Sequence, residues 1–223
     1  MTTTEITAAV TEAKIRRTMA ALEKNNMTAL FAENAAKAAE LALSLISKGD
    51  TISCGGSMGL KDSGLFEKLQ SGDYNFLDRS KGELSQEEIV EIYRKSFFAD
   101  AYFSSANALT ENGELYNVDG NGNRVAAIAY GPKKVIFLVG ANKIVRDLAE
   151  AERRVKCVAA PCNGLRLKTG TPCEKQQQCI AAEGRMTEGC RSPGRMCCQY
   201  LITGYQKQKE RITGIITPEE LGY

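Results

Sequence analysis

Residues 100–140, DAYFSSANALTENGELYNVDGNGNRVAAIAYGPKKVIFLVG, carry the strongest indications of the fold. The stretch opens with an extended run in which Tyr102 and Phe103 favour a strand. It closes on VIFLV, an apolar run that is typical of a strand buried in a parallel sheet. Residues 107–124 between them are rich in Gly, Asn and Asp, and are too polar for a core. Because long loops inside compact domains are usually functional, we predict that this loop carries the binding or active site.

Working outward, hydrophobic spacing predicts helices over residues 5–24, 33–48 and 85–99, the last with a capping box from Ser85 to Glu88. Its apolar positions Ile89, Ile92, Tyr93 and Phe97 are expected in the core. Short apolar runs predict strands at 50–54, 74–79, 157–161 and 211–218. Residues 133–161 are then expected to form a strand–helix–strand unit with parallel pairing. This alternation predicts an α/β fold with a mostly parallel sheet flanked by helices in three layers.

We expect one domain with four parts. These are N-terminal helices (1–48), an α/β core (49–161), a cysteine-rich segment (162–200), and a final strand with its tail (201–223).

Composition narrows the function. The formal net charge of +2 does not indicate a nucleic-acid partner, although an excess of basic residues in the C-terminal third suits an anionic ligand. No apolar stretch is long enough for a membrane helix and no secretion signal is evident, so a cytoplasmic location is expected. The chain has no histidine, so acid–base chemistry must use Asp, Glu, Lys, Cys or Tyr.

Two segments supply the candidate ligand-binding residues. Gly55, Gly56 and Ser57 follow a predicted strand and precede a helix, a junction whose free N–H groups suit a phosphate or carboxylate, although an ordinary tight turn has the same pattern. In the central loop, the carboxyl end of a strand is followed by polar residues, where open α/β sheets bind ligands. The candidates there are Ser105, Asn107, Thr110, Asn117, Gly120, Asn123 and Arg124.

Three carboxylates in the central loop are candidates for catalysis: Glu111, Glu114 and Asp119. Asp119 and Arg124 admit two interpretations, a pair that braces the loop or a base beside an anion clamp.

The segment PCNGLRLKTGTPCEKQQQCIAAEGRMTEGCRSPGRMCCQY holds six of the eight cysteines and few apolar residues, so it needs some form of cross-link. We predict Cys173, Cys179, Cys190 and Cys197 as metal ligands. The irregular spacing favours an iron–sulfur cluster over zinc, because Cys-x-x-Cys pairs are missing. A disulfide or redox switch, or free thiols in a packed lid, also fit this spacing.

Residues 105–136, SANALTENGELYNVDGNGNRVAAIAYGPKKVI, resemble the signature of the LUD family, the lactate-utilisation domain of lactate-utilisation protein C and its stand-alone relatives. The cysteine segment resembles the Pro-Cys…Cys…Ser-Pro-x-Arg-x-Cys stretch of stand-alone LUD proteins. The resemblance implies the fold shared by ribose-phosphate isomerases and CoA transferases. Related CoA transferases use a Glu nucleophile and related sugar-phosphate isomerases an acidic base, but a fold does not specify a reaction.

We therefore expect a protein that takes part in the utilisation of a small hydroxy acid such as lactate. It would bind a small carboxylate or phosphate between residues 55–57 and 107–124, with an iron–sulfur cluster and iron–sulfur partner proteins. No dinucleotide fingerprint is present, so neither nicotinamide nor flavin is predicted. One alternative is an isomerase- or transferase-like enzyme acting on a sugar phosphate or acyl-CoA. Another is a non-catalytic electron-transfer or sensor subunit. The oligomeric state stays open.

Overall fold

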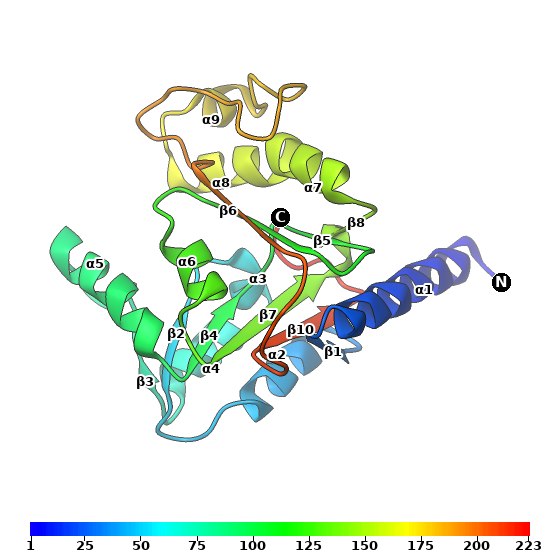
Figure 1. Ribbon diagram of the computed structural model, residues 1–223, viewed down its shortest axis with the longest axis horizontal. Coiled ribbons are helices and arrows are strands. Elements are labelled where there is room, and N and C mark those ends of the chain that lie inside the picture. The colour runs from blue at the N-terminus through cyan, green and yellow to red at the C-terminus, as the bar shows by residue number, and fades with distance from the viewer.

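Six parallel strands form the central sheet of the computed structural model, which describes residues 1–223 (Figure 1). Their spatial order is β1 (Thr28–Phe31), β10 (Ile212–Thr217), β7 (Lys134–Gly140), β4 (Ala101–Ser104), β2 (Thr51–Cys54) and β3 (Asn75–Phe76). The predicted α/β fold with its mostly parallel sheet is thus confirmed. β7 and β10 lie in the interior of the sheet because their apolar runs are buried on both faces.

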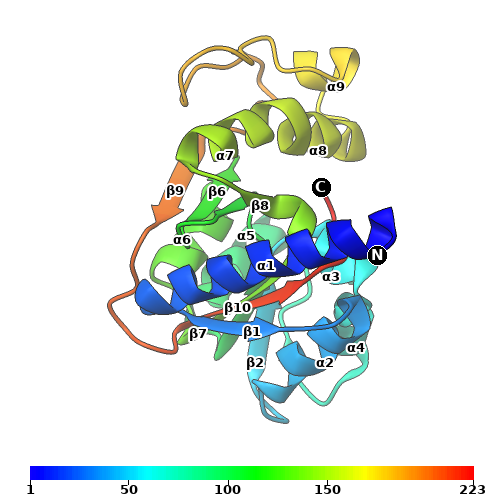
Figure 2. The ribbon, with the colours of Figure 1, turned by 90° about the vertical axis from the view of Figure 1, so that its right-hand side faces the viewer.

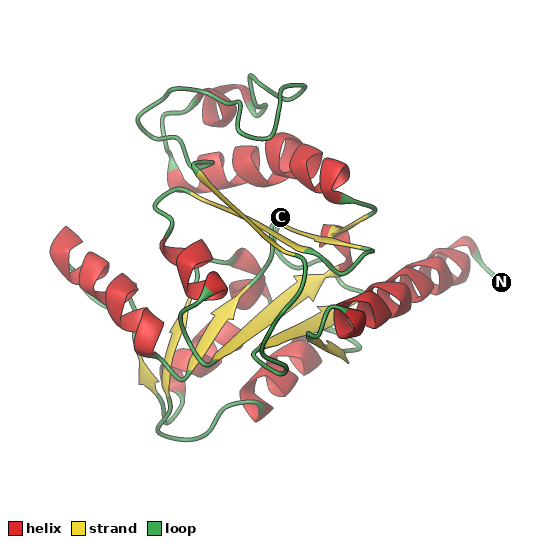
Figure 3. Ribbon diagram, viewed as in Figure 1, coloured by secondary structure: helices red, strands yellow, loops and turns green.

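Helices cover both faces of this sheet (Figure 3). In chain order they are α1 (Thr3–Lys24), α2 (Ala35–Ser44), α3 (Met58–Asp62), α4 (Leu65–Ser71), α5 (Gln86–Lys95), α6 (Asn123–Ala129), α7 (Leu148–Arg154), α8 (Ala160–Leu167) and α9 (Pro172–Gln176). Helices α2, α3 and α4 bury Ala39, Leu60 and Leu65 against one face, where Phe103 and Leu138 point. The opposite face packs against α1, α6 and a second sheet.

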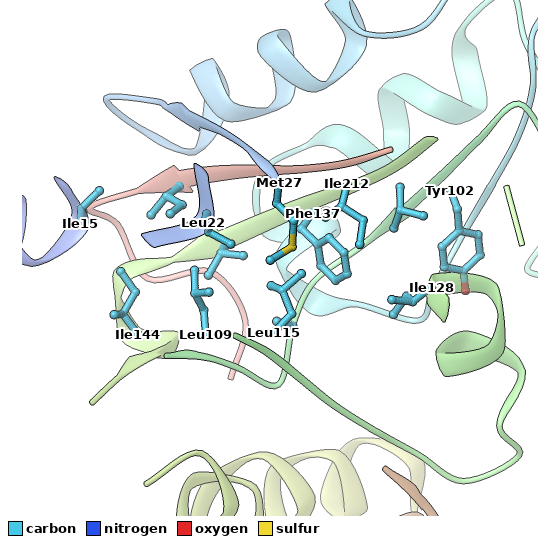
Figure 4. Close-up of a cluster of buried hydrophobic side chains, with 14 of the residues drawn as sticks. Ile15, Leu22, Met27, Tyr102, Leu109, Leu115, Ile128, Phe137, Ile144 and Ile212 are labelled. Carbon is cyan, nitrogen blue, oxygen red and sulfur yellow. The ribbon is translucent and has the colours of Figure 1, made fainter. Parts of the chain in front are cut away.

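The second sheet has four strands in the order β8 (Ile144–Val145), β5 (Ala108–Thr110), β6 (Leu115–Asp119) and β9 (Gln199–Thr203). Strands β5 and β6 form an antiparallel hairpin, so the prediction that residues 107–124 are one polar loop is wrong. Its strands are buried on both sides, and Figure 4 shows Leu109 and Leu115 facing Phe137 of the large sheet. The polar Asn117 is fully buried within the same hairpin.

A further helical layer covers the outer side of the small sheet. Helix α7 continues through a π-helical turn, Val155–Ala159, into α8, so the strand predicted at residues 157–161 is wrong. A short apolar run does not distinguish a strand from a helical segment. Here Ala151, Val155 and Ala160 pack against Tyr116 and Val118 of β6. The views in Figures 1 and 2 show α7 and α8 standing apart from the large sheet, with the small sheet between.

Other local predictions differ in extent. The helix over 5–24 and the capping box at Ser85 are confirmed. Helix α5, however, has no fully buried residue, because it packs with one side only and the predicted core positions are half-buried. The strand predicted at 74–79 has only the two residues of β3, and the N-terminal part contains an additional strand, β1, at the sheet edge. No helix has the length and apolar character required to cross a membrane.

Candidate functional site

A cavity of about 640 Å³ lies at the carboxyl ends of the parallel strands. The segments that follow four neighbouring strands form one side: residues 54–58 after β2, 77–80 after β3, 105–107 after β4, and Lys143 after β7. Residues 118–124 and parts of α8 and the cysteine-rich segment complete the wall. Ligands of open α/β sheets bind at this edge because several loops converge there.

The cavity wall is strongly basic. It includes six cationic side chains and two carboxylates, which are Lys61, Arg79, Arg124, Lys143, Arg166 and Arg195 against Asp78 and Asp119. The Asp78 carboxylate accepts hydrogen bonds from Gln70 and Ser80. Neither carboxylate forms an ion pair with a side chain of the wall, so the cavity presents an excess of positive charge to a small anion.

Four uncharged oxygen atoms surround the Arg124 guanidinium and accept hydrogen bonds from it. Its guanidinium donates to Asn107 Oδ1 and Asn117 Oδ1, each at 2.9 Å, and to the carbonyls of Ser105 (3.2 Å) and Val118 (2.6 Å). Burial lowers the pKa of Arg124, with the nearby Asp119 charge opposing that shift. Arg124 thus donates four hydrogen bonds to oxygens of the protein itself. It therefore stabilises the hairpin, and its main contribution to the cavity is its positive charge.

Asp119 contacts the same residue through the backbone. Its Oδ2 accepts the Arg124 backbone N–H at 2.9 Å, where α6 begins. Asp119 and Arg124 are therefore in contact at the start of the helix, but their side chains do not form an ion pair. Asp119 is the only one of the three predicted catalytic carboxylates that lines the cavity.

Lys143 ends the 3-10 turn Ala141–Lys143 that directly follows β7, and its side chain is 3% exposed. Its Nζ donates to Ser105 Oγ at 3.0 Å. Burial lowers the pKa of Lys143 to about 7, the Arg154 and Arg124 charges add to this effect, and Asp62 opposes it. The result is a buried amine on the cavity wall without a carboxylate in contact.

Gly55 and Gly56 lie so close to arginine side chains that a Cβ at either position would collide with them. A Cβ at Gly56 would lie 2.5 Å from an Arg79 Nη2, and one at Gly55 would lie 3.0 Å from Arg124 Cδ. The Arg79 guanidinium lies over the Tyr93 ring, 5.4 Å from its centroid, so its N–H edges stay available to a ligand. The predicted cradle of free N–H groups is only partly present, because Gly55 N donates to Phe103 O and Ser57 N to Gly55 O.

Of the thirteen residues predicted for ligand binding or catalysis, nine line this cavity: Gly55, Gly56, Ser57, Ser105, Asn107, Asp119, Gly120, Asn123 and Arg124. Four others do not. Glu111 pairs with Arg17 of α1 at 2.9 Å, and Glu114 accepts the Thr110 hydroxyl at 2.8 Å within the hairpin turn. Asn117 lies behind Arg124, which its side chain holds in place. The hairpin turn thus directs both glutamates away from the cavity.

The sequence reasoning missed Arg79, Lys143 and Arg166. The first two come shortly after predicted or buried strands, and polar residues at the carboxyl ends of parallel strands are ligand-binding candidates. The residues after β3 and β7 fit the same pattern as the candidates predicted after β2 and β4. Arg166 carries no such signal, because its position depends on α8 folding over the cavity; there its guanidinium donates to Tyr223 Oη at 2.7 Å.

The four predicted metal ligands do not form a metal centre as placed. No group of three or more Cys, Asp or Glu side chains is arranged to hold a metal ion. Cys173 lies with its Sγ 3.2 Å from Thr171 Oγ1, on α9. Burial raises the pKa of Cys197, and Cys179 and Cys190 lie close enough to contribute to the same shift. The residues as arranged therefore do not fit a four-thiolate cluster.

Two cations, the buried Lys156 and the half-buried Arg195, provide the cross-link that the cysteine-rich segment was expected to need. Lys156 donates from Nζ to the carbonyls of Gly184 and Arg185, at 2.6 Å each. Arg195 donates to the carbonyls of Thr187, Cys190 and Cys197. These bonds satisfy backbone carbonyls of an irregular segment, which is why it is ordered with little apolar core.

Comparison with known proteins shows which family and which solved structures this chain resembles. Residues 15–217 match the model of the LUD domain family, described as "LUD domain". A DUF162 family protein from Deinococcus radiodurans is similar in structure over 93% of this chain and 97% of its own, with a TM-score of 0.50 and 14% identity. The eIF2B delta of Chaetomium thermophilum matches over 51% of this chain and 49% of its own, with a TM-score of 0.33 and 23% identity. No curated protein matches the chain. Because the family model spans most of its length, the chain belongs to the LUD domain family.

Proposed function

We propose that the protein binds a small anionic metabolite, a hydroxy- or oxo-carboxylate or a sugar phosphate, in the cavity at the strand ends. Membership of the LUD family supports a place in the utilisation of small hydroxy acids such as lactate. A cavity of about 640 Å³ has the size of a metabolite site, since small-molecule pockets measure roughly 300–1,000 Å³.

One observation carries this proposal: the buried Lys143 and the half-buried Arg124 place two basic groups at one cavity without a carboxylate paired to either side chain. A buried unpaired charge is costly, and a bound anion would offset that cost. Arg79 adds a third cation whose N–H edges face the turn at Gly56. A ligand carboxylate or phosphate would accept charge-assisted hydrogen bonds from Lys143 and Arg79, while Arg124 would contribute its charge.

Arg79→Ala tests this assignment. Calorimetry with lactate, pyruvate and ribose 5-phosphate should detect binding of at least one anion by the unaltered protein. Loss of one charge-assisted hydrogen bond should weaken that binding by about tenfold or more. Arg16→Ala is the matched control, because Arg16 is exposed on α1 and pairs with Glu12 in its own helix. Absence of binding for every anion, or equal affinity in Arg79→Ala, would contradict the proposal.

A second candidate function, isomerase-like proton transfer on the bound anion, is favoured by Asp119 and Lys143 lining the same cavity. A carboxylate and an amine there supply an acid–base pair in a protein without histidine. Incorporation of solvent deuterium into a carbon-bound position of the ligand, followed by NMR, would reveal this chemistry. Asp119→Asn should abolish it, and incorporation that persists in this variant would exclude Asp119 as the base.

A further inference from the structure

We propose that Lys143 forms a covalent imine with a small carbonyl compound that carries a carboxylate or phosphate group. The inference deepens the proposed function and rests on it, since the anionic group must first bind in the same cavity. It narrows the ligand class from small anions in general to anions with an aldehyde or ketone.

The position of Lys143 suits attack on a bound ligand. The side chain is buried, yet it belongs to the cavity wall at the end of β7. Its Nζ donates one hydrogen bond, to Ser105 Oγ, and forms no ion pair. A lysine buried only for stability would be expected to meet a carboxylate or several carbonyls, as Lys156 does.

The surroundings favour the neutral amine, which is the nucleophilic form. The charged groups that face Lys143 are Arg124 from the start of α6, Arg154 from the end of α7 and Asp62 from α3. Burial and then the two cations lower the pKa of Lys143 to about 7 against the opposing effect of Asp62, so a large fraction of the amine is unprotonated near neutral pH. Ser105, from the segment after β4, contacts the nitrogen directly.

The step balances without an external oxidant or reductant. Nζ attacks the carbonyl carbon, a C–N bond forms, and a proton passes from nitrogen to the former carbonyl oxygen. The resulting carbinolamine loses this hydroxyl with a further proton as water, which leaves a C=N bond. The Ser105 hydroxyl, 3.0 Å from Nζ, can both accept and donate a proton during these transfers. Arg79, which lines the same cavity, would bind the anionic group.

Borohydride trapping tests the imine. The full-length protein is incubated with pyruvate or with ribose 5-phosphate, treated with sodium borohydride, and weighed by intact-mass spectrometry. Hydride reduces the C=N bond to a stable amine, so the protein gains the mass of the ligand less one oxygen atom. Peptide mapping should place that gain on Lys143. Pyruvate and ribose 5-phosphate separate a carboxylate from a phosphate requirement, and lactate, which lacks a carbonyl, should give no adduct.

The Lys143→Arg variant should lose the adduct, whereas Lys48→Arg should retain it, because Lys48 is exposed and pairs with Asp73. Peptide mapping of the unaltered protein decides the assignment even if Lys143→Arg does not fold. Calorimetric binding of pyruvate or ribose 5-phosphate without any trapped adduct would overturn the imine and leave the proposed function standing. An adduct confined to other lysines would also overturn it. Absence of both binding and adduct would overturn both proposals.

Discussion

Lys143 Nζ donates a hydrogen bond to Ser105 Oγ over 3.0 Å, joining the carboxyl ends of β7 and β4, which are neighbours in the sheet. Both side chains are buried and neither is paired with a carboxylate. The contact places an amine and a hydroxyl at one point of a cationic cavity. Such a concentration of buried, incompletely compensated groups is more typical of a functional site than of a structural core.

The unfolding free energy of the protein should depend on pH through Lys143. The pKa of Lys143 is about 7 in the folded protein and has its ordinary higher value in the unfolded chain, so between these values the unfolded state binds a proton that the folded state does not. The free energy of unfolding should therefore rise with pH above about 7, by up to about 1.4 kcal/mol per pH unit. Urea unfolding between about pH 6.5 and 7.5, about one unit below the ordinary thiol pKa of about 8.5, measures this slope.

Lys143→Met supplies the control for that slope. The variant lacks the titrating amine, so the unfolding free energy of the unaltered protein minus that of the variant should increase as pH rises. A difference that stays constant over this range would mean that Lys143 remains charged in the folded state.

Arg124→Met should destabilise the protein by about 3 kcal/mol, because buried acceptors that lose a donor cost roughly 1–3 kcal/mol each while one buried charge is relieved. The acceptors are the amide oxygens of Asn107 and Asn117 and two backbone carbonyls. Arg79→Met is the matched comparison, and its loss of a stacked contact with Tyr93 should cost about 1 kcal/mol or less. Equal effects of the two substitutions in urea unfolding would contradict the bracing role of Arg124.

Glu111→Gln should leave ligand binding unchanged, although the sequence pattern made Glu111 a catalytic candidate. Its carboxylate pairs with Arg17 on the surface of α1, outside the cavity. Loss of such an exposed pair should lower the unfolding free energy by about 1 kcal/mol or less. Calorimetry with the ligand identified for the unaltered protein checks this. A large loss of affinity would place Glu111 in the site after all.

Lys156→Met should loosen the cysteine-rich segment. Removing the amine leaves the Gly184 and Arg185 carbonyls without their buried donor, so subtilisin should cleave near residues 180–198 faster than in the unaltered protein. Lys175→Met on α9 is the exposed control and should not change the cleavage rate.

The same assay with a metal chelator addresses the predicted iron–sulfur site. Because the thiols as arranged do not form a metal-binding group, chelation should leave the cleavage rate unchanged. Faster cleavage after chelation, together with iron and sulfide in the anaerobically purified protein, would instead show that Cys173, Cys179, Cys190 and Cys197 gather around a cluster.

Elements whose signals are local could be predicted from the amino-acid sequence alone. Residues 135–139 form a strand because a continuous apolar run is buried on both faces of a parallel sheet, and residues 212–217 form one because Ile and Thr favour extended backbone. Helix α5 begins at the Ser85 capping box because two orphan N–H groups are satisfied there. The cavity edge was also predictable, since residues 55–57 and 105–107 follow strands.

Only the tertiary structure decided which residues face the cavity and which lie elsewhere. The buried Asn117 accepts a hydrogen bond from Arg124 at Oδ1 while its Nδ2 has no partner, and hydrophobic periodicity does not encode such a contact. Arg79 and Lys143 converge because the strand order β7-β4-β2-β3 brings distant loops to one edge. Glu111 and Glu114 face away because the hairpin turn points outward from that edge. Periodicity records how much of a residue is buried, whereas partner identity depends on contacts between segments far apart in the chain.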